Sequence, residues 1–97
     1  MAFVQIIDMH TSREEELRAL EDQWRKATDG KRTLRRSVLA RDRKDPNHLL
    51  ILAFFDSYES AMENSNLPET SEFGAKQAAL LDQAPTFLDL DIIEELN

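Results

Sequence analysis

The apolar residues in the first third of the chain follow a strand pattern and then a helix pattern. Residues 3–10, FVQIIDMH, combine β-branched and large apolar side chains over a strand length, which predicts a first strand. Over residues 13–29 the apolar side chains recur every three or four positions, as on one face of a helix: Leu17, Leu20, Trp24 and Ala27. We expect Ser12 to cap this helix, with Glu15 bonding back to the cap, and Gly30 to end it.

Two further strands follow, joined by a tight turn. Residues 33–42 alternate in side-chain character and predict a second strand at an edge of the sheet. Asp45-Pro46-Asn47 is a turn signal, because proline presets its own backbone angle and asparagine tolerates the left-handed region. We therefore expect this tripeptide to close a hairpin. Residues 49–55, LLILAFF, are apolar without interruption and predict a third, buried strand.

The remainder of the chain predicts a broken helical layer and a last strand. Ser57 is placed to cap a short helix over residues 58–65, and Asn66 to cap a second helical piece that Pro85 ends. Residues 86–93, TFLDLDII, alternate again and predict the fourth strand. The resulting order, β-α-β-β-α-β, is typical of ferredoxin-like α+β folds.

We expect residues 1–97 to form one such domain, a four-stranded antiparallel sheet with the helices on one face. The other face then lacks a cover, yet both flanks of strand 49–55 are apolar. Burying a Leu or Phe side chain contributes about 1.5–3 kcal/mol, so Leu50, Leu52 and Phe54 together account for roughly 5–9 kcal/mol. That is comparable to the total stability of a domain, about 5–15 kcal/mol. We therefore expect a homodimer that stacks the two uncovered sheet faces as a dimeric α+β barrel.

Composition and charge exclude several classes of protein. No stretch reaches the roughly 18 apolar residues of a membrane span, and there is no cysteine for disulfides or thiolate metal sites. The first ten residues lack the features of a secretory signal, so we expect a cytoplasmic protein. The net charge of −7 and the absence of aromatic residues among the bases argue against nucleic-acid binding. With two glycines and no glycine-rich phosphate loop, nucleotide cofactors are not expected either.

The apolar third strand runs into FFDSYESAMENSN, and the broken second helix leads to TFLDLDII. Together with the element order, these features resemble the dimeric α+β barrel superfamily, and within it the antibiotic biosynthesis monooxygenase-like branch. The resemblance implies a ligand cleft between each sheet and its helices. Characterised members include cofactor-independent oxygenases of polycyclic phenols or quinols, haem-degrading enzymes and proteins without a known reaction. Residues 58–84 lack the tryptophan and histidine that haem-degrading relatives carry there, so no haem or other cofactor is expected.

Four side chains are candidates for a site in that cleft. His10 has a free pKa suited to proton transfer near neutrality, and would take the proton of a phenolic substrate; the alternative is a strand-end histidine bonded to a loop. Trp24 would form a flat wall against a planar ligand, or is simply the largest core residue of its helix. Tyr58 and Asn64 would hydrogen-bond a ligand oxygen, unless Tyr58 only packs on the helix start. His48 is expected in a solvated loop, apart from His10, so no metal site is predicted.

These expectations lead to two functions. The first is a cofactor-independent monooxygenase-like enzyme acting on a small hydrophobic aromatic compound of the phenol or quinol type. His10 and Tyr58 are its catalytic candidates, and Trp24 and Asn64 its substrate-binding candidates. The second is a non-catalytic dimeric barrel that binds a small apolar molecule, and a purely structural module is a third class. The catalytic positions of the family are matched only in part, so the sequence leaves open whether the protein is an enzyme.

Overall fold

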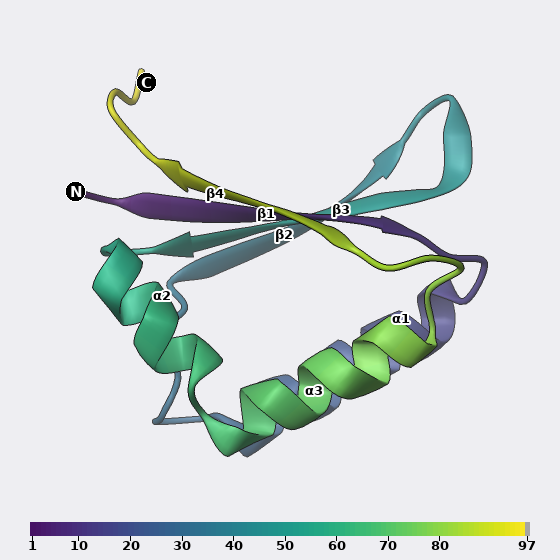
Figure 1. Ribbon diagram of the computed structural model, residues 1–97, viewed down its shortest axis with the longest axis horizontal. Helices are drawn as coiled ribbons and strands as arrows, with labels where there is room; N and C mark the ends of the chain where they lie inside the picture. The colour runs from purple at the N-terminus through teal and green to yellow at the C-terminus, as the bar shows by residue number, and fades with distance from the viewer. Residues whose placement is uncertain (97) are drawn as a thin grey trace.

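The computed structural model describes residues 1–96, which form four strands and three helices. In chain order they are β1 (Phe3–His10), α1 (Glu14–Ala27), β2 (Arg36–Asp42), β3 (Asp45–Phe55), α2 (Tyr58–Ser65), α3 (Pro68–Ala79) and β4 (Thr86–Asp91) (Figure 1). Among these residues, no helix is both long and apolar enough to cross a lipid bilayer.

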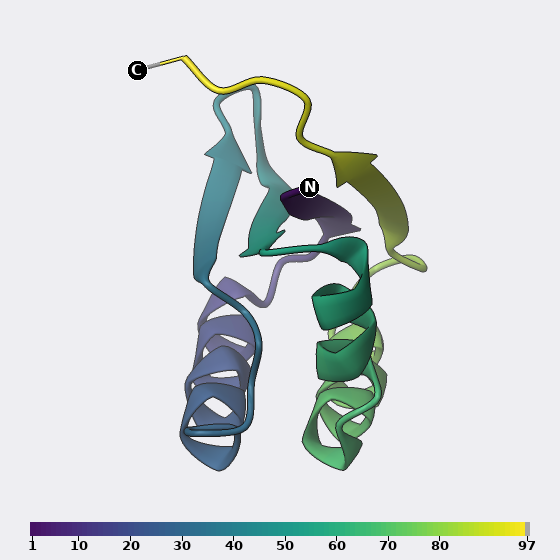
Figure 2. The same ribbon diagram turned by 90° about the vertical axis from the view of Figure 1, so that its left-hand side faces the viewer.

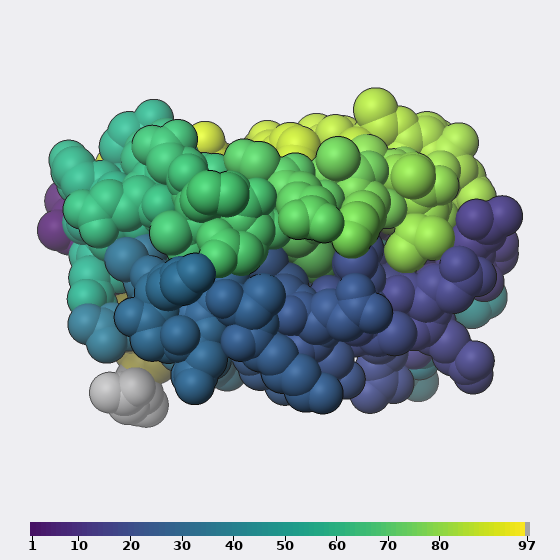
Figure 3. All heavy atoms as spheres, turned by 90° about the horizontal axis from the view of Figure 1, so that it is seen from below, coloured from purple at the N-terminus to yellow at the C-terminus, as the bar shows by residue number. Residues whose placement is uncertain are grey.

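The strands form one antiparallel sheet in the order β2-β3-β1-β4. All three helices lie under the same face of this sheet (Figure 2). Seen from the helix side, α1 runs beside the α2–α3 pair, and together they cover the sheet (Figure 3). The α+β, ferredoxin-like fold predicted from the element order is therefore confirmed.

The hairpin between β2 and β3 is tighter than the sequence suggested. Its turn lies at residues 43–44, and β3 already begins at Asp45, so the turn predicted at residues 45–47 was wrong. Asp42 Oδ1 accepts a hydrogen bond from the Lys44 amide at 2.8 Å, which closes the two-residue turn. Pro46 is tolerated in the strand because it lies in the irregularity between the pairs Arg41–Leu49 and Asp42–Asp45, so no residue of β2 is paired with it.

The helix starts also differ in part from the predictions. Ser57 caps α2 as expected, in a reciprocal pair of hydrogen bonds with Ser60. At α1 the predicted Ser12 cap is wrong, because Arg13 occupies the cap position and its amide donates to the buried Thr11 hydroxyl. At α3 the cap is Leu67 instead of Asn66, since Pro68 takes the first helical position, which suits its fixed angle.

The two faces of the sheet are packed differently. The odd-numbered residues of β1 and β3 point to the helices and form the core with α1: Phe3, Met9, Leu17, Leu49, Ile51 and Phe55. The even-numbered residues and their partners on the edge strands form the opposite face, which we call the open face. Its larger apolar residues are Val4, Ile6, Val38, Leu50, Leu52, Phe54, Leu88 and Leu90. Leu88 and Leu90 are 50% and 42% exposed, so in the single chain this face is apolar and only partly covered.

Candidate functional site

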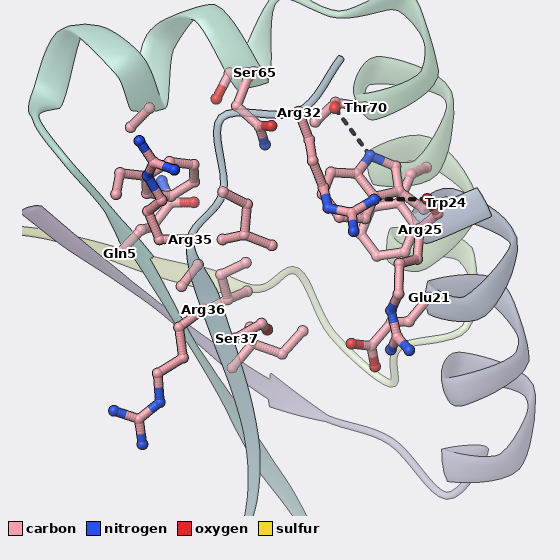
Figure 4. Close-up of a pocket in the computed structure, with 18 residues that line it drawn as sticks. Gln5, Glu21, Trp24, Arg25, Arg32, Arg35, Arg36, Ser37, Ser65 and Thr70 are labelled. Carbon is pink, nitrogen blue, oxygen red and sulfur yellow. Dashed lines mark hydrogen bonds between the residues drawn. The ribbon is translucent and has the colours of Figure 1, made fainter. Parts of the chain in front are cut away.

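A cavity of about 470 Å³ lies between the sheet and the helices. Ile51, Ala53 and Phe55 of β3 line it from the sheet, and Phe73 of α3 lines it from the helical layer. Trp24 of α1 also lines it from the helical layer (Figure 4). Polar side chains from both layers also reach it: Gln5, Glu21, Ser37, Asn64, Ser65 and Thr70. A concave apolar pocket of this size with a few polar groups is typical of small-molecule sites.

The aromatic end of the cavity is held in place by contacts between α1 and α3. Trp24 Nε1 donates a hydrogen bond to Thr70 Oγ1 at 3.0 Å (Figure 4). The Trp24 and Phe73 rings are tilted against each other at a centroid distance of 5.9 Å. The indole is therefore fixed by a hydrogen bond and by its contact with Phe73, and the two rings form an aromatic wall of the cavity.

Glu21 carries the only acidic side chain among the described residues that line this cavity. It lies four residues after Leu17 and three before Trp24, so the helical period places it on the inner face of α1. Its Oε1 atom is buried and has no hydrogen-bond partner within residues 1–96. Burial raises the pKa of Glu21, while the nearby Arg25 opposes the shift. The carboxyl is thus a proton acceptor stronger than a surface carboxylate.

Arginines surround the cavity, but most of them are already engaged. Arg25 lies 3.5 Å from Asp22, and Arg35 pairs with Asp56 at 2.6 Å, which lowers the pKa of the Asp56 carboxyl. Arg36 turns away from the cavity, over the Phe54 ring of the open face (Figure 4).

Arg32 differs from these arginines in its partners. Its guanidinium lies 6.0 Å from the Trp24 ring centroid, and its Nη1 donates to the Arg25 carbonyl at 2.7 Å. It forms no ion pair with any carboxylate of residues 1–96. Arg32 therefore places a positive charge beside the aromatic wall that a bound anion can use.

Several solved structures share this arrangement of sheet and helices. Neither a protein-family model nor a curated protein matches the chain. Rv0793 from Mycobacterium tuberculosis aligns over 100% of both chains, with a TM-score of 0.80 and 18% identity. SnoaB, a cofactor-independent oxygenase from Streptomyces nogalater, aligns over 98% of this chain and 96% of its own, with a TM-score of 0.83 and 11% identity. A candidate antibiotic biosynthesis monooxygenase from Caulobacter crescentus aligns over 96% and 91%, with a TM-score of 0.81 and 12% identity.

The chain has the antibiotic biosynthesis monooxygenase-like fold. The resemblance noted from the element order is thereby confirmed at the level of the fold. At identities of 11–18% this likeness concerns the fold, and any activity has to be argued from the side chains of the site.

Within this monooxygenase-like fold, the four candidate residues fall into two groups. Trp24 and Asn64 line the cavity, and the buried Asn64 also accepts a hydrogen bond from the Thr33 amide at 3.2 Å. Tyr58 is not among the lining residues; it is 47% exposed and packs edge-on against Phe3 at 5.5 Å. His10 also lies elsewhere, because it is an even-numbered residue of β1 and belongs to the open-face side of the sheet.

The structure brings His10 together with His48, which corrects two expectations. His48 is part of β3, not of a loop, and it lies directly opposite His10 in the ladder. The two rings stack at 4.5 Å, so the histidines are not apart. His48 Nδ1 lies 2.9 Å from Asp42 Oδ2, and its Nε2 lies 2.7 Å from Asp8 Oδ1. Hydrogen bonds to Asp42 and Asp8 raise the pKa of His48. The hydrogen bond between His48 and Asp42 also lowers the pKa of Asp42.

Proposed function

We propose that this chain is a cofactor-independent monooxygenase-like protein that acts on a small hydrophobic aromatic compound of the phenol or quinol type. The cavity volume of about 470 Å³ suits a compact ring system, and the Trp24 and Phe73 rings suit a planar one. The shared fold with SnoaB, a cofactor-independent oxygenase, supports the reaction class. The observation that carries the proposal is the unpartnered, buried Glu21 carboxylate oxygen at a cavity with an aromatic wall.

The proposed chemistry begins with a proton transfer. The Glu21 carboxylate accepts the phenolic proton, and its raised pKa makes it a better base than an ordinary carboxylate. The positive charge of Arg32 beside Trp24 stabilises the resulting phenolate. The electron-rich anion then reacts with O₂. A phenol with a free ring carbon plus O₂ yields a quinone plus water, so the substrate supplies all four electrons and no cofactor is required.

In this proposal Glu21 takes the role of base that the sequence suggested for His10. His10 and Tyr58 lie outside the cavity, so neither contacts a ligand bound there. Trp24 and Asn64 keep their proposed roles, Trp24 as the wall against the ring and Asn64 as a hydrogen-bonding group near the α2 end.

The test is oxygen consumption with a panel of phenols and quinols. We expect Glu21→Gln to lower turnover about 100-fold or more, the usual contribution of a positioned general base, with little change in binding. Glu15→Gln is the matched control, because Glu15 lies on the same helix with its side chain exposed. Equal turnover in the wild type and Glu21→Gln would remove Glu21 from the mechanism.

A non-catalytic small-molecule-binding barrel is the second candidate. It is favoured by the location of His10 and Tyr58 outside the cavity, which leaves a single titratable carboxyl there. The chain has one tryptophan, Trp24, so its fluorescence reports directly on cavity occupancy. Quenching by a panel compound without any oxygen uptake would favour binding over catalysis.

We also infer that two copies of the chain stack their open faces to form a homodimer. The open face presents apolar side chains on all four strands, and those of β4 are about half exposed in the single chain. Stacking a second sheet on it would bury this surface, as in sheet-on-sheet packing. A second copy is the natural occupant because a two-fold axis pairs the same apolar face with itself.

A further inference from the structure

A cluster of metal-binding side chain types lies at one end of the sheet, away from the cavity. Asp8 and His10 come from the end of β1, and His48 comes from the neighbouring strand β3. One ligand atom from each of the three lies within 4.8 Å of the others. Asp8 Oδ1 is 2.7 Å from His48 Nε2 and 3.7 Å from His10 Nε2, so both imidazoles approach the same carboxylate oxygen.

These two distances lie close to the separation between ligand atoms in a tetrahedral zinc site. Zinc binds imidazole nitrogen and carboxylate oxygen at about 2.0–2.2 Å, which puts two such ligands about 3.4 Å apart. The two measured separations lie on either side of that value. The rings are now stacked, at an interplanar angle of 7°, and each nitrogen lone pair lies in its own ring plane. Coordination therefore needs a turn of the His10 ring, whose side chain is 37% exposed in the single chain.

A fourth residue orients one of the ligands. His48 Nδ1 lies 2.9 Å from Asp42 Oδ2, so the carboxylate holds a proton on Nδ1 and leaves Nε2 directed towards Asp8. A carboxylate behind a ligating imidazole fixes its tautomer and raises its basicity in many zinc sites. In the ion-free protein, a proton between His48 Nε2 and Asp8 Oδ1 occupies the place that a cation would take.

We propose that Asp8, His10 and His48 bind a zinc-like divalent cation, with Asp42 orienting His48 and water completing the coordination. Two imidazoles and one carboxylate favour Zn²⁺ over Mg²⁺ or Ca²⁺, which prefer sites made of oxygen atoms. The proposal is independent of the proposed oxygenase function, because the cluster does not contribute to the cavity.

The test is a titration of the untagged protein with ZnCl₂ by calorimetry, with MgCl₂ as the comparison ion. We expect one Zn²⁺ per chain with micromolar or tighter affinity, and no Mg²⁺ binding at the same concentrations. His10→Ala and His48→Ala should each weaken Zn²⁺ binding at least tenfold. Asp42→Asn should weaken it about 10–100-fold, as expected for a residue that orients a ligand. Asp56→Asn is the matched control, since Asp56 is an exposed, paired carboxylate that lies outside the cluster.

The chain has two histidines and no cysteine, so a His10→Ala/His48→Ala double variant removes every imidazole and leaves no thiolate. Zinc binding that persists unchanged in a folded double variant would overturn the proposal. If the variants do not fold, the wild type still decides it by Co²⁺ substitution. An intense ligand-field spectrum of tetrahedral Co²⁺ at one equivalent supports the site, and the weak spectrum of hydrated Co²⁺ contradicts it.

Discussion

The two faces of the sheet are built from the same strands, but one is covered by helices and the other is not. On the helix side, Leu49, Ile51 and Phe55 are buried by the chain's own helices, and the space left beside them is the aromatic-walled cavity. On the open face, Leu50, Leu52 and Phe54 of the same strand stay only partly covered. Strand alternation therefore separates the side with the cavity, where we propose that a ligand binds, from the side on which we propose that a second copy packs, and single substitutions can distinguish the two.

The largest expected effect comes from truncating neighbouring leucines on opposite faces. Leu49→Ala removes a fully packed side chain next to Met9 and Leu17, and we expect a loss of about 2–5 kcal/mol in the free energy of unfolding. At low protein concentration, Leu50→Ala should lower the free energy of unfolding clearly less than Leu49→Ala does, because Leu50 is partly exposed in the single chain. Urea denaturation of both variants measures the difference. Equal losses at nanomolar concentration would contradict the asymmetry between the faces.

The next effect concerns association. Leu52→Glu places a charge at the centre of the open face, where a stacked second sheet would bury it without a partner. We expect the dimer dissociation constant to rise at least 100-fold while the single chain stays folded. Sedimentation velocity at micromolar concentration checks this, with circular dichroism to confirm the fold. Ala78→Glu, exposed on α3, is the control. A wild type that sediments as a monomer at micromolar concentration would refute the homodimer.

A smaller effect is expected on the cavity side from the contact that fixes the aromatic wall. Thr70→Val removes the acceptor of the Trp24 indole N–H with little change in volume. We expect a loss of about 0.5–1.5 kcal/mol in stability, the usual net value of one hydrogen bond, and a several-fold weaker binding of aromatic ligands. Denaturation and Trp24 fluorescence titration measure the two effects. Thr86→Val, exposed at the start of β4, controls for the substitution itself.

Local patterns predicted more of this fold than of its sites. The continuous apolar run of residues 49–55 predicted β3, and the helical stripe ending at Trp24 and Ala27 predicted α1, because both are patterns of neighbouring residues. The hairpin was misplaced because Asp45-Pro46-Asn47 satisfies a turn rule equally well, and only strand pairing decides between it and residues 43–44.

Site residues depend on contacts between distant parts of the chain. His10 and His48 meet only through the register of β1 against β3, which no spacing in the sequence reveals. Glu21 is the exception. It stands within the Leu17–Trp24 stripe, and a carboxylate on an otherwise apolar helix face was a signal that the sequence did contain.

The smallest expected effect is a pH-dependent gain in stability when the Glu21 carboxylate is removed. In the unfolded chain the Glu21 carboxyl titrates near 4.5, whereas burial gives it a higher pKa in the folded protein. Below pH 4.5 the group is protonated in both states and does not affect stability. As the pH rises through the folded pKa, the wild type loses stability, because the ionised form is favoured in the unfolded chain. Glu21→Gln lacks this loss.

We therefore expect Glu21→Gln to melt at the same temperature as the wild type at pH 4 and above it at pH 7. Glu15→Gln, on the exposed side of the same helix, should show no such divergence. Thermal melts of the three proteins across this pH range measure it. Parallel melting curves for the wild type and Glu21→Gln would mean that the carboxyl is as well solvated as a surface group. The proposed base in the cavity would then lose its physical basis. The proposed contrast between a helix side that carries the chemistry and an open face that associates would be lost with it.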